Sequence, residues 1–342
     1  MLPALCLLAS GDTPKLPGIG AAIQSAVDAH EIAGAVTVVV TRDGVVHCEA
    51  TGLADLARQD PVRPDSMFWI ASMTKPLTAA AILMLQDEGK LNVADPVAKH
   101  LPAFAELKTP SGRPANLTIA QLLMHTSGLN EGEPKAVAQA RTLAELVPLF
   151  VAARMQFGPG TQWRYCQSGI NTAGRIMEVV SGQTFDGFLQ SRLFDPLGMT
   201  NTTFYPARKP AAQRAVAYRS NRTTGALDGK RYLSPAAMTL LTTVQTGELP
   251  TGFLQSAEWG NRGTNYGWGI GTCILRAPHP GVAAMLSPGT FGHGGAWGTQ
   301  AWMDPVRGIG YVLMVQRADF GNSDGSELRR RFQERAVAAL GR

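Results

Sequence analysis

Residues 67–75 have the sequence MFWIASMTK, and the rest of the chain can be arranged around this stretch. Its first half is aromatic and apolar, and the segment that follows, as far as Glu88, is rich in Ala, Leu and Met. These residues favour a helix, and Gly89 is well placed to end it. The sequence therefore predicts a helix from Ser72 to Glu88, with the serine in its first turn.

Before this stretch, the pattern predicts one helix and a pair of strands. Apolar residues recur at helical spacing within residues 18–30. Residues 35–40 and 45–51 are rich in β-branched side chains, and Asp43-Gly44 between them is a typical hairpin turn. The N-terminal part is therefore expected to supply a helix and an antiparallel hairpin.

After this stretch, the expected secondary structure changes first to short helices and then back to strands. Short helical patterns between Pro- and Gly-rich loops fill residues 91–254, strand patterns then return, and a last helix is expected at residues 326–340. The expected helices are 119–124, 143–153, 171–180 and 185–193, the expected surface loop is 221–230, and the expected late strands are 267–275, 300–303 and 310–317.

This order of elements predicts an α/β protein of the α+β type. An antiparallel β-sheet flanked by helices and built from both chain ends would occupy residues 1–90 and 255–342. A mainly helical subdomain, residues 91–254, would be inserted between those two segments. We expect one catalytic unit, with the site at the junction of the two subdomains.

The composition is that of an ordinary globular protein. Of 342 residues, 45% are hydrophobic and 17% are charged, and the formal net charge is +5. The basic residues are scattered, and their densest cluster, residues 329–331, is interpreted as the solvated face of a helix. No apolar run approaches the ~20 residues that span a bilayer. Neither nucleic acid nor a stable membrane span is expected, and the oligomeric state stays open.

The N-terminus leaves the cellular compartment open. Residues 2–9 form an apolar run like the centre of an export signal, but no Lys or Arg precedes it. If residues 1–10 are an export signal, the protein works in the periplasm or outside the cell, which is the expectation favoured here; a cytoplasmic location is the alternative. The four cysteines form no C-x-x-C pair, and we expect reduced, mostly buried thiols.

Ser72 and Lys75 form an S-x-x-K pair at the start of the predicted helix. Residues three apart share one face of a helix, so the hydroxyl and the amine can meet. A serine hydroxyl needs an adjacent base to act as a nucleophile, and a helix N-terminus favours developing negative charge. The alternative is a helix-capping serine followed by a solvated lysine.

Tyr165 follows the turn at residues 157–161 (FGPGT), and Gln167 lies two residues beyond it. A tyrosine near a lysine ammonium has a lowered pKa, so it can take the serine proton and later return it. Gln167 could hydrogen-bond to the acyl group of a substrate. The alternative is a half-buried tyrosine whose hydroxyl is bonded to the backbone.

Residues 291–298 (FGHGGAWG) form a third glycine-rich motif. Glycines beside His293 permit close approach of the backbone to a ligand. A backbone N–H in this segment could supply half of an oxyanion hole, and His293 could line the pocket. The alternative is a glycine-rich β-turn without a function.

Taken together, these motifs resemble those of the serine β-lactamase and penicillin-recognising hydrolase superfamily. The similarity is to its class C-like branch, which includes family VIII carboxylesterases and D-amino-acid peptidases, and runs from about Ile19 to the C-terminus. It rests on Ser72-Met73-Thr74-Lys75, residues 122–129 (LLMHTSGL), residues 159–161 (PGT) leading into Tyr165, residues 196–199 (PLGM) and His293-Gly294-Gly295.

The resemblance implies a serine β-lactamase/DD-peptidase-like fold and a role for each motif. Ser72 would be the acylated nucleophile, and Lys75 and Tyr165 would handle its proton, although which of the two accepts it stays open. No metal and no cofactor is implied. The backbone N–H groups of Ser72 and Ala296 would form the oxyanion hole, the substrate-binding residues would be Gln167, His293, Gly294, Gly295 and Trp297, and His125 would be structural.

Two departures from the β-lactamase pattern favour an esterase. Gln167 stands where those enzymes have Asn, and His293 stands where they have the Lys that helps to hold the β-lactam carboxylate. A neutral histidine attracts that carboxylate less strongly. No Gly-x-Ser-x-Gly occurs in the chain, which excludes an α/β-hydrolase elbow.

The expected substrate is therefore a small molecule, an acyl ester or amide. We expect a carboxylesterase for small or medium acyl esters. A β-lactamase or D-amino-acid/DD-peptidase stays open, as does a non-catalytic ligand sensor on the same fold. An apolar cleft lined by Trp297 and Phe157 would favour esters, whereas Arg164 or Arg262 facing an acyl carboxylate would favour β-lactams.

Overall fold

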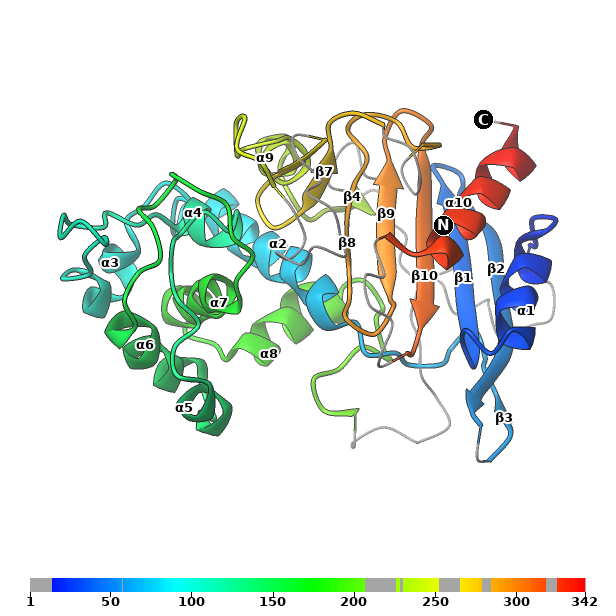
Figure 1. The fold of residues 1–342 in the computed structure, drawn as a ribbon, viewed down its shortest axis with the longest axis horizontal. Coiled ribbons are helices and arrows are strands. Elements are labelled where there is room, and N and C mark those ends of the chain that lie inside the picture. Colours follow the sequence, from blue (N-terminus) through cyan, green and yellow to red (C-terminus); the bar gives the residue numbers. More distant parts are fainter. Residues whose placement is uncertain are drawn as a thin grey trace. The chain divides into compact units, whose positions relative to one another are not determined.

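In the computed structural model, the chain forms two compact units (Figure 1). The first comprises residues 1–74, 193–231 and 275–342, and the second comprises residues 75–192 and 232–274. The structure describes residues 14–56, 58–206, 226–227, 230–251, 265–278, 284–317 and 325–341. The export-signal hypothesis for residues 1–10, together with Cys6 and Arg262, lies outside these residues.

Eight of the described strands form one sheet in the order β3-β2-β1-β10-β9-β8-β7-β6, and β4 and β5 form a separate pair. The neighbouring pairs from β3 to β8 are antiparallel, and Ala35 of β1 faces Val315 of β10. The prediction of an antiparallel sheet built from both chain ends is thereby confirmed. The elements that lie mainly in the first unit are α1 (Ile19–Asp28), β1 (Gly34–Thr41), β2 (Gly44–Asp55), β3 (Asp60–Pro61), the 3-10 turn η2 (Ala71–Met73), β4 (Ala226–Leu227), β5 (Lys230–Arg231), β8 (Phe291–Gly294), β9 (Gln300–Asp304), β10 (Ile309–Val315) and α10 (Glu327–Leu340).

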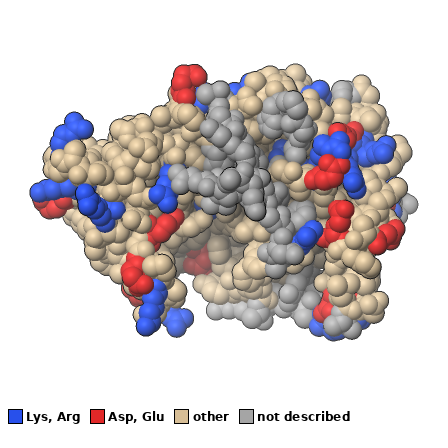
Figure 2. Space-filling view, viewed as in Figure 1, with Lys and Arg blue, Asp and Glu red and all other residues tan. Residues whose placement is uncertain are grey.

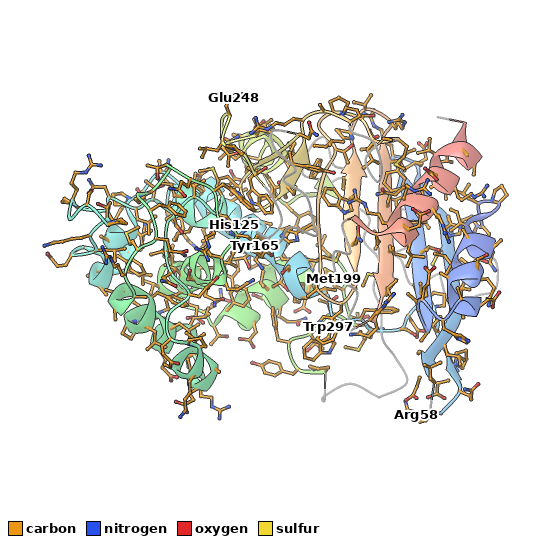
Figure 3. All side chains as sticks on the ribbon, viewed as in Figure 1. Arg58, His125, Tyr165, Met199, Glu248 and Trp297 are labelled. Carbon is orange, nitrogen blue, oxygen red and sulfur yellow. The ribbon has the colours of Figure 1, made fainter. Side chains whose placement is uncertain are left out.

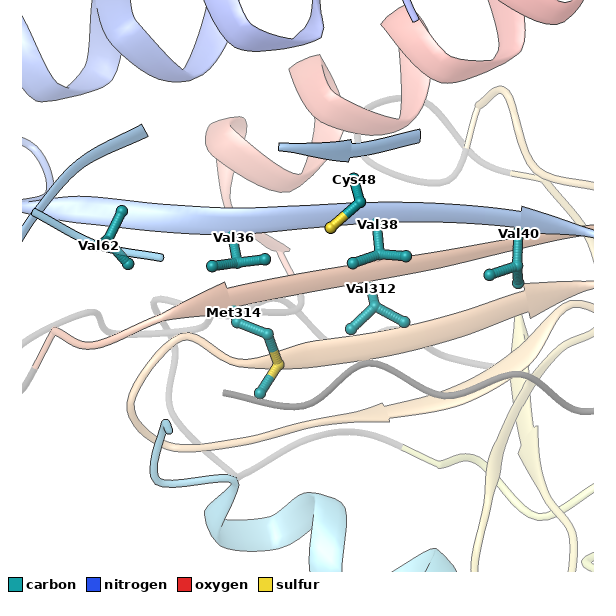
Figure 4. Packing of buried hydrophobic residues seen from close by; sticks show 7 residues of the cluster. All are labelled: Val36, Val38, Val40, Cys48, Val62, Val312 and Met314. Atoms are coloured by element: carbon teal, nitrogen blue, oxygen red, sulfur yellow. The ribbon is translucent and has the colours of Figure 1, made fainter. Parts of the chain in front are cut away.

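The core of the first unit explains how the segment before Ser72 is held. Small β-branched side chains cover one face of β1 and β10, where they fit the pleated surface (Figure 4). Phe68 and Ile70 pack against this cluster, whereas Trp69 between them is 61% exposed. This alternation anchors the extended segment that leads into Ser72. The cluster consists of Val36, Val38, Val40, Cys48, Val62, Val312 and Met314.

Helices α1 and α10 lie side by side at the sheet (Figure 1). The expectation that residues 329–331 form a solvated face is wrong for Arg329, which is 1% exposed. Its guanidinium lies 4.0 Å from the Trp302 ring centroid, and Nε donates to the Gln333 side chain. Arg330 and Arg331 do pair with glutamates of the same helix. On the face in Figure 2, basic and acidic residues are interspersed.

The second unit is mainly helical, and hydroxyl side chains begin several of its helices. Thr118 caps α4 in a reciprocal capping box with Gln121. Thr142, Thr184 and Ser234 cap α6, α8 and α9 with a single bond each, their hydroxyl oxygens accepting from a backbone N–H of the first turn. Its elements are α2 (Thr74–Asp87), α3 (Val97–His100), the 3-10 turn η3 (Pro102–Phe104), α4 (Ile119–Leu123), α5 (Pro134–Gln139), α6 (Leu143–Ala152), α7 (Gln167–Ser181), α8 (Phe185–Leu189), the π-helical turn η4 (Gln190–Phe194), α9 (Pro235–Thr242), β6 (Tyr266–Trp268) and β7 (Cys273–Leu275).

The secondary structure differs from the expectation in three places. The strand expected at 267–275 is two strands, β6 and β7, because the chain turns at Gly271, whose φ is +77°. The helix expected from Ser72 begins as the 3-10 turn η2. Within the segment expected as a loop, 221–230, the described residues belong to the short pair β4 and β5. Among the described residues, no helix has the length and apolar character needed to cross a bilayer.

Candidate active site

Ser72 lies in the tight turn η2, directly before α2. The Met73 N–H donates to the Ile70 carbonyl at 2.9 Å, which closes this turn. Ala71, just before the serine, has a φ of +44°, in the left-handed region that costs a non-glycine residue free energy. Anchored upstream by Phe68 and Ile70, the backbone thus holds Ser72 in a strained turn at the start of a helix.

The glycine-rich turn after β8 lies against the segment that precedes Ser72. The Gly295 N–H donates to Thr299 O at 2.7 Å, and Gly298 N–H donates to Gly295 O at 3.1 Å. A Cβ on Gly295 would lie 2.4 Å from the Ile70 carbonyl oxygen, so only glycine fits there. Ala296 is exposed in this turn. The two expected oxyanion-hole residues, Ser72 and Ala296, therefore lie on adjoining segments of one unit.

Trp69 and Trp297 form an aromatic pair beside these two segments. Their ring centroids are 6.1 Å apart in an edge-to-face arrangement. The Trp69 N–H donates to the Gln316 side chain at 3.2 Å, and Thr299 Oγ1 is 3.4 Å from the Trp69 carbonyl oxygen. An aromatic pair, with Trp69 exposed and Trp297 half-buried, is thus fixed next to the turn at Ser72.

His293 is buried in β8, with only 2% of its surface exposed. Its Nδ1 lies 2.6 Å from the carbonyl oxygen of Gly294. Because a carbonyl can only accept, Nδ1 carries the proton in this contact. His293 and Gly294 therefore shape the strand that leads into the turn at Gly295.

Lys75 and Tyr165 are brought together in the second unit. Lys75 is 4% exposed, and its Nζ lies 4.7 Å from the centroid of the Tyr165 ring. Burial lowers the pKa of Lys75 from 10.5 to about 8, against the opposing influence of Cys166 and Glu131. Burial also raises the pKa of the Cys166 thiol, so this group is neutral near pH 7. Glu131 therefore supplies the negative charge that acts on Lys75.

An aromatic cluster fixes the Tyr165 ring (Figure 3). The His125 ring centroid lies 4.4 Å from that of Tyr165 and 5.0 Å from that of Trp268. His125 has a φ of +61°, and its carbonyl accepts from Arg164 N–H at 2.9 Å. Its Nδ1 accepts from Cys166 N–H at 3.3 Å. His125 thus holds both backbone neighbours of Tyr165, in agreement with the structural role expected for it.

The motif at residues 122–129 is packed tightly on the turn that precedes Tyr165. Gly128 has a φ of +75°, and a Cβ there would lie 2.1 Å from Phe157 O. The Gln156 N–H donates to Gly128 O, and Gly160 N–H donates to Thr126 O, both at 2.8 Å. These contacts hold the two motifs together in the second unit.

Gln167 is exposed at the first position of α7. The Glu131 carboxylate accepts from the backbone N–H groups of Gln167 and Ser168 at 2.6 and 2.8 Å. Arg164 donates to the Gln156 side chain, and Phe157 is buried. Sequence reasoning missed Glu131, Trp268 and Trp69; only Trp69 carried a signal, as an aromatic residue three positions before the serine.

The described cysteines Cys48, Cys166 and Cys273 are reduced and buried, as expected. Within the same described ranges, no group of three or more His, Cys, Asp or Glu side chains could hold a metal ion.

Relatives and solved structures share this arrangement of the chain. Protein Rv1367c of Mycobacterium tuberculosis (strain ATCC 25618 / H37Rv) is 26% identical, covering 96% of this chain and 100% of that protein. Esterase EstB of Burkholderia gladioli is 30% identical over 55% of this chain and 51% of its own length. A family VIII carboxylesterase structure has a TM-score of 0.75 at 20% identity, covering 96% of this chain and 99% of that one.

The similarity in fold extends to the structure of EstCE1, described as a hydrolase with promiscuous acyltransferase activity. It has a TM-score of 0.74 at 21% identity, and the match covers 94% of this chain and 97% of that one. The Beta-lactamase family itself matches residues 19–336, which include every motif described above. The chain therefore belongs to the Beta-lactamase family.

Proposed function

We propose that the protein is a serine hydrolase that forms an acyl-enzyme on Ser72, and that it acts as a carboxylesterase on small or medium acyl esters. The observation that carries this proposal is the buried Lys75 against the Tyr165 ring, with the pKa of Lys75 lowered to about 8. A purely structural lysine would gain little from burial in an aromatic cluster, whereas a proton acceptor needs a pKa near the working pH.

The proposed reaction has two steps that share one proton-handling unit. Ser72 Oγ attacks the ester carbonyl while the Lys75/Tyr165 unit takes its proton, and the backbone N–H groups of Ser72 and Ala296 hold the oxyanion. Tyr165 then returns the proton to the leaving alkoxide, and the alcohol departs. A water molecule attacks the acyl-enzyme by the same route, which releases the carboxylic acid and restores the Ser72 hydroxyl.

Two observations support an ester rather than a β-lactam as substrate. The third motif has His293, buried and bonded to its own strand, where a β-lactamase has a cationic lysine. The pair of exposed Trp69 and half-buried Trp297 offers an apolar surface beside the nucleophile turn, suited to an uncharged acyl chain. EstB and the carboxylesterase structure, whose names state ester hydrolysis, are consistent with this choice.

Kinetics with two substrates test the proposal. Wild type and Ser72→Ala are each incubated with p-nitrophenyl butyrate and, separately, with nitrocefin, and intact-mass spectra record any acyl adduct. We expect ester turnover in wild type and its loss in Ser72→Ala, with nitrocefin slow or inert. Fast nitrocefin turnover would instead support the β-lactamase alternative. Absence of both turnover and adduct would reject hydrolysis of these classes and favour the ligand sensor.

A further inference from the structure

The start of α7 is held by a residue remote in sequence. The first backbone N–H groups of a helix have no partner within the helix and need another acceptor. The residue at the capping position, Cys166, makes no side-chain capping bond. The Glu131 carboxylate takes that role, with one oxygen on Gln167 N–H at 2.6 Å and the other on Ser168 N–H at 2.8 Å.

These two bonds fix the backbone directly after Tyr165. Gln167 and Ser168 are the second and third residues beyond the tyrosine. His125 already holds the residues on either side of Tyr165, through Arg164 N–H and Cys166 N–H. A shift of the start of α7 would therefore move the Tyr165 ring relative to the Lys75 ammonium that lies 4.7 Å from its centroid.

The same carboxylate acts on Lys75 by its charge. The Tyr165 ring lies against the Lys75 ammonium, and Cys166 and Glu131 both act on the pKa of Lys75 through space. Burial raises the pKa of the thiol, which is therefore neutral near pH 7. Glu131 thus supplies the negative charge that favours the ammonium form of Lys75 and opposes its desolvation.

We infer that Glu131 is a positioning residue of the Lys75/Tyr165 unit, which fixes the tyrosine through the start of α7 and balances the charge of the lysine. This inference rests on the proposed function, because the position of Tyr165 and the charge of Lys75 affect activity only if these two residues transfer a proton. Neither the S-x-x-K motif nor the Tyr165 motif contains the residue.

Glu133 provides a matched control two residues away. Its carboxylate caps α5 with the same two-oxygen geometry, accepting from Lys135 N–H at 3.0 Å and Ala136 N–H at 2.7 Å. It does not contribute to the pKa shift of Lys75. Glu131→Ala and Glu133→Ala therefore remove equivalent helix caps, each worth about 1 kcal/mol, and only one of them touches the candidate site.

The kinetic test compares these variants on p-nitrophenyl butyrate across pH. We expect Glu131→Ala to lower kcat by about 10- to 100-fold with KM within about 3-fold, because positioning of a general base is lost. Glu131→Gln keeps an acceptor oxygen, so it should retain more of kcat. Loss of the negative charge lowers the pKa of Lys75, so the acidic limb of the pH–rate profile of Glu131→Gln should move to lower pH. Glu133→Ala should leave kcat, KM and the acidic limb of the pH–rate profile unchanged.

A second measurement does not depend on turnover. The Lys75 Cε carbon-13 shift is titrated in lysine-labelled protein and assigned with Lys75→Met. Its midpoint should lie lower in Glu131→Gln than in wild type, and should not move in Glu133→Gln. An equal midpoint in all three proteins, or kinetics of Glu131→Ala that match Glu133→Ala, would overturn the inference. Failure of the proposed function would appear separately, as turnover that survives in Ser72→Ala.

Discussion

The segments around Ser72 and the cluster around Tyr165 are held by different means. In the first unit, Gly295 lies against the Ile70 carbonyl, and backbone hydrogen bonds define the turn beside it. In the second unit, the rings of His125 and Trp268 and the carboxylate of Glu131 hold the tyrosine and its helix. One region is fixed by close backbone approach and the other by side-chain packing.

This difference predicts how each region responds to mutation. A turn held by its backbone should lose its conformation when a Cβ is added at a close contact. It should keep that conformation when most neighbouring side chains are replaced. A cluster held by side chains can lose a single chemical group and keep its fold. In the proposed reaction, the region around Ser72 needs a fixed backbone geometry for its N–H donors, whereas the region around Lys75 and Tyr165 needs a low-dielectric surrounding that tunes a pKa.

The largest effect is expected for Lys75→Met. Removal of the proposed proton acceptor should lower kcat on p-nitrophenyl butyrate by about 10³-fold or more. The same change should stabilise the protein, because burial of the ammonium costs free energy. Native Lys75 has a pKa of about 8 instead of 10.5, so the unfolded chain binds more protons between these values and wild-type stability rises with pH there.

Urea unfolding at several pH values measures this gain. Lys75→Met should be more stable than wild type by about 1–3 kcal/mol at pH 7. The difference should shrink from pH 8 and vanish above about pH 10.5. A variant less stable than wild type at pH 7 would show that Lys75 is a structural cation and contradict its role as a tuned base.

Gly295→Ala tests the backbone-held region. The new Cβ would lie 2.4 Å from the Ile70 carbonyl oxygen, so the turn at Ala296 must move away from the Ser72 segment. Loss of one oxyanion donor typically costs about 10²- to 10³-fold in kcat, and we expect a decrease of that size. The measurement is kcat on p-nitrophenyl butyrate, with circular dichroism to verify the fold.

Gly20→Ala is the matched control in the same unit. Its Cβ would also meet an atom at 2.4 Å, but that atom is a carboxylate oxygen of the flexible Glu49 side chain, which can rotate away. We therefore expect full activity and little change in Tm. If Gly295→Ala proved as active as Gly20→Ala, the proposed oxyanion role of the turn would be wrong.

The smallest effect is expected for Trp69→Ala. Removing one ring of the pair should raise KM about 3- to 10-fold for p-nitrophenyl esters of medium acyl chains, in line with the ~1 kcal/mol typical of an aromatic contact, and should change acetyl ester kinetics less. Val306→Ala, which truncates a side chain that is 73% exposed in the same unit, should leave both substrates unaffected. Equal changes in KM for the acetyl and the medium-chain esters would show that Trp69 and Trp297 do not bind the acyl chain.

Local patterns predicted much of the fold. The hairpin of β1 and β2 follows from β-branched residues on both sides of Asp43-Gly44, and α6 and α10 follow from their periodicity. These features depend on neighbours in sequence. The turn at Gly271 that splits one expected strand, and the burial of Arg329 over Trp302, depend on contacts between segments that periodicity does not record.

The sequence by itself determined the candidate residues and the order of the motifs, because the three-residue spacing of Ser72 and Lys75 puts them on one face wherever the chain is helical. Only the tertiary structure decided their surroundings. It placed Lys75 under the Tyr165 ring, where desolvation lowers its pKa, and it brought Glu131 to a helix that begins 36 residues later. Burial and charge are properties of the folded neighbourhood, so the chemistry of these residues follows from packing that no single stretch of sequence specifies.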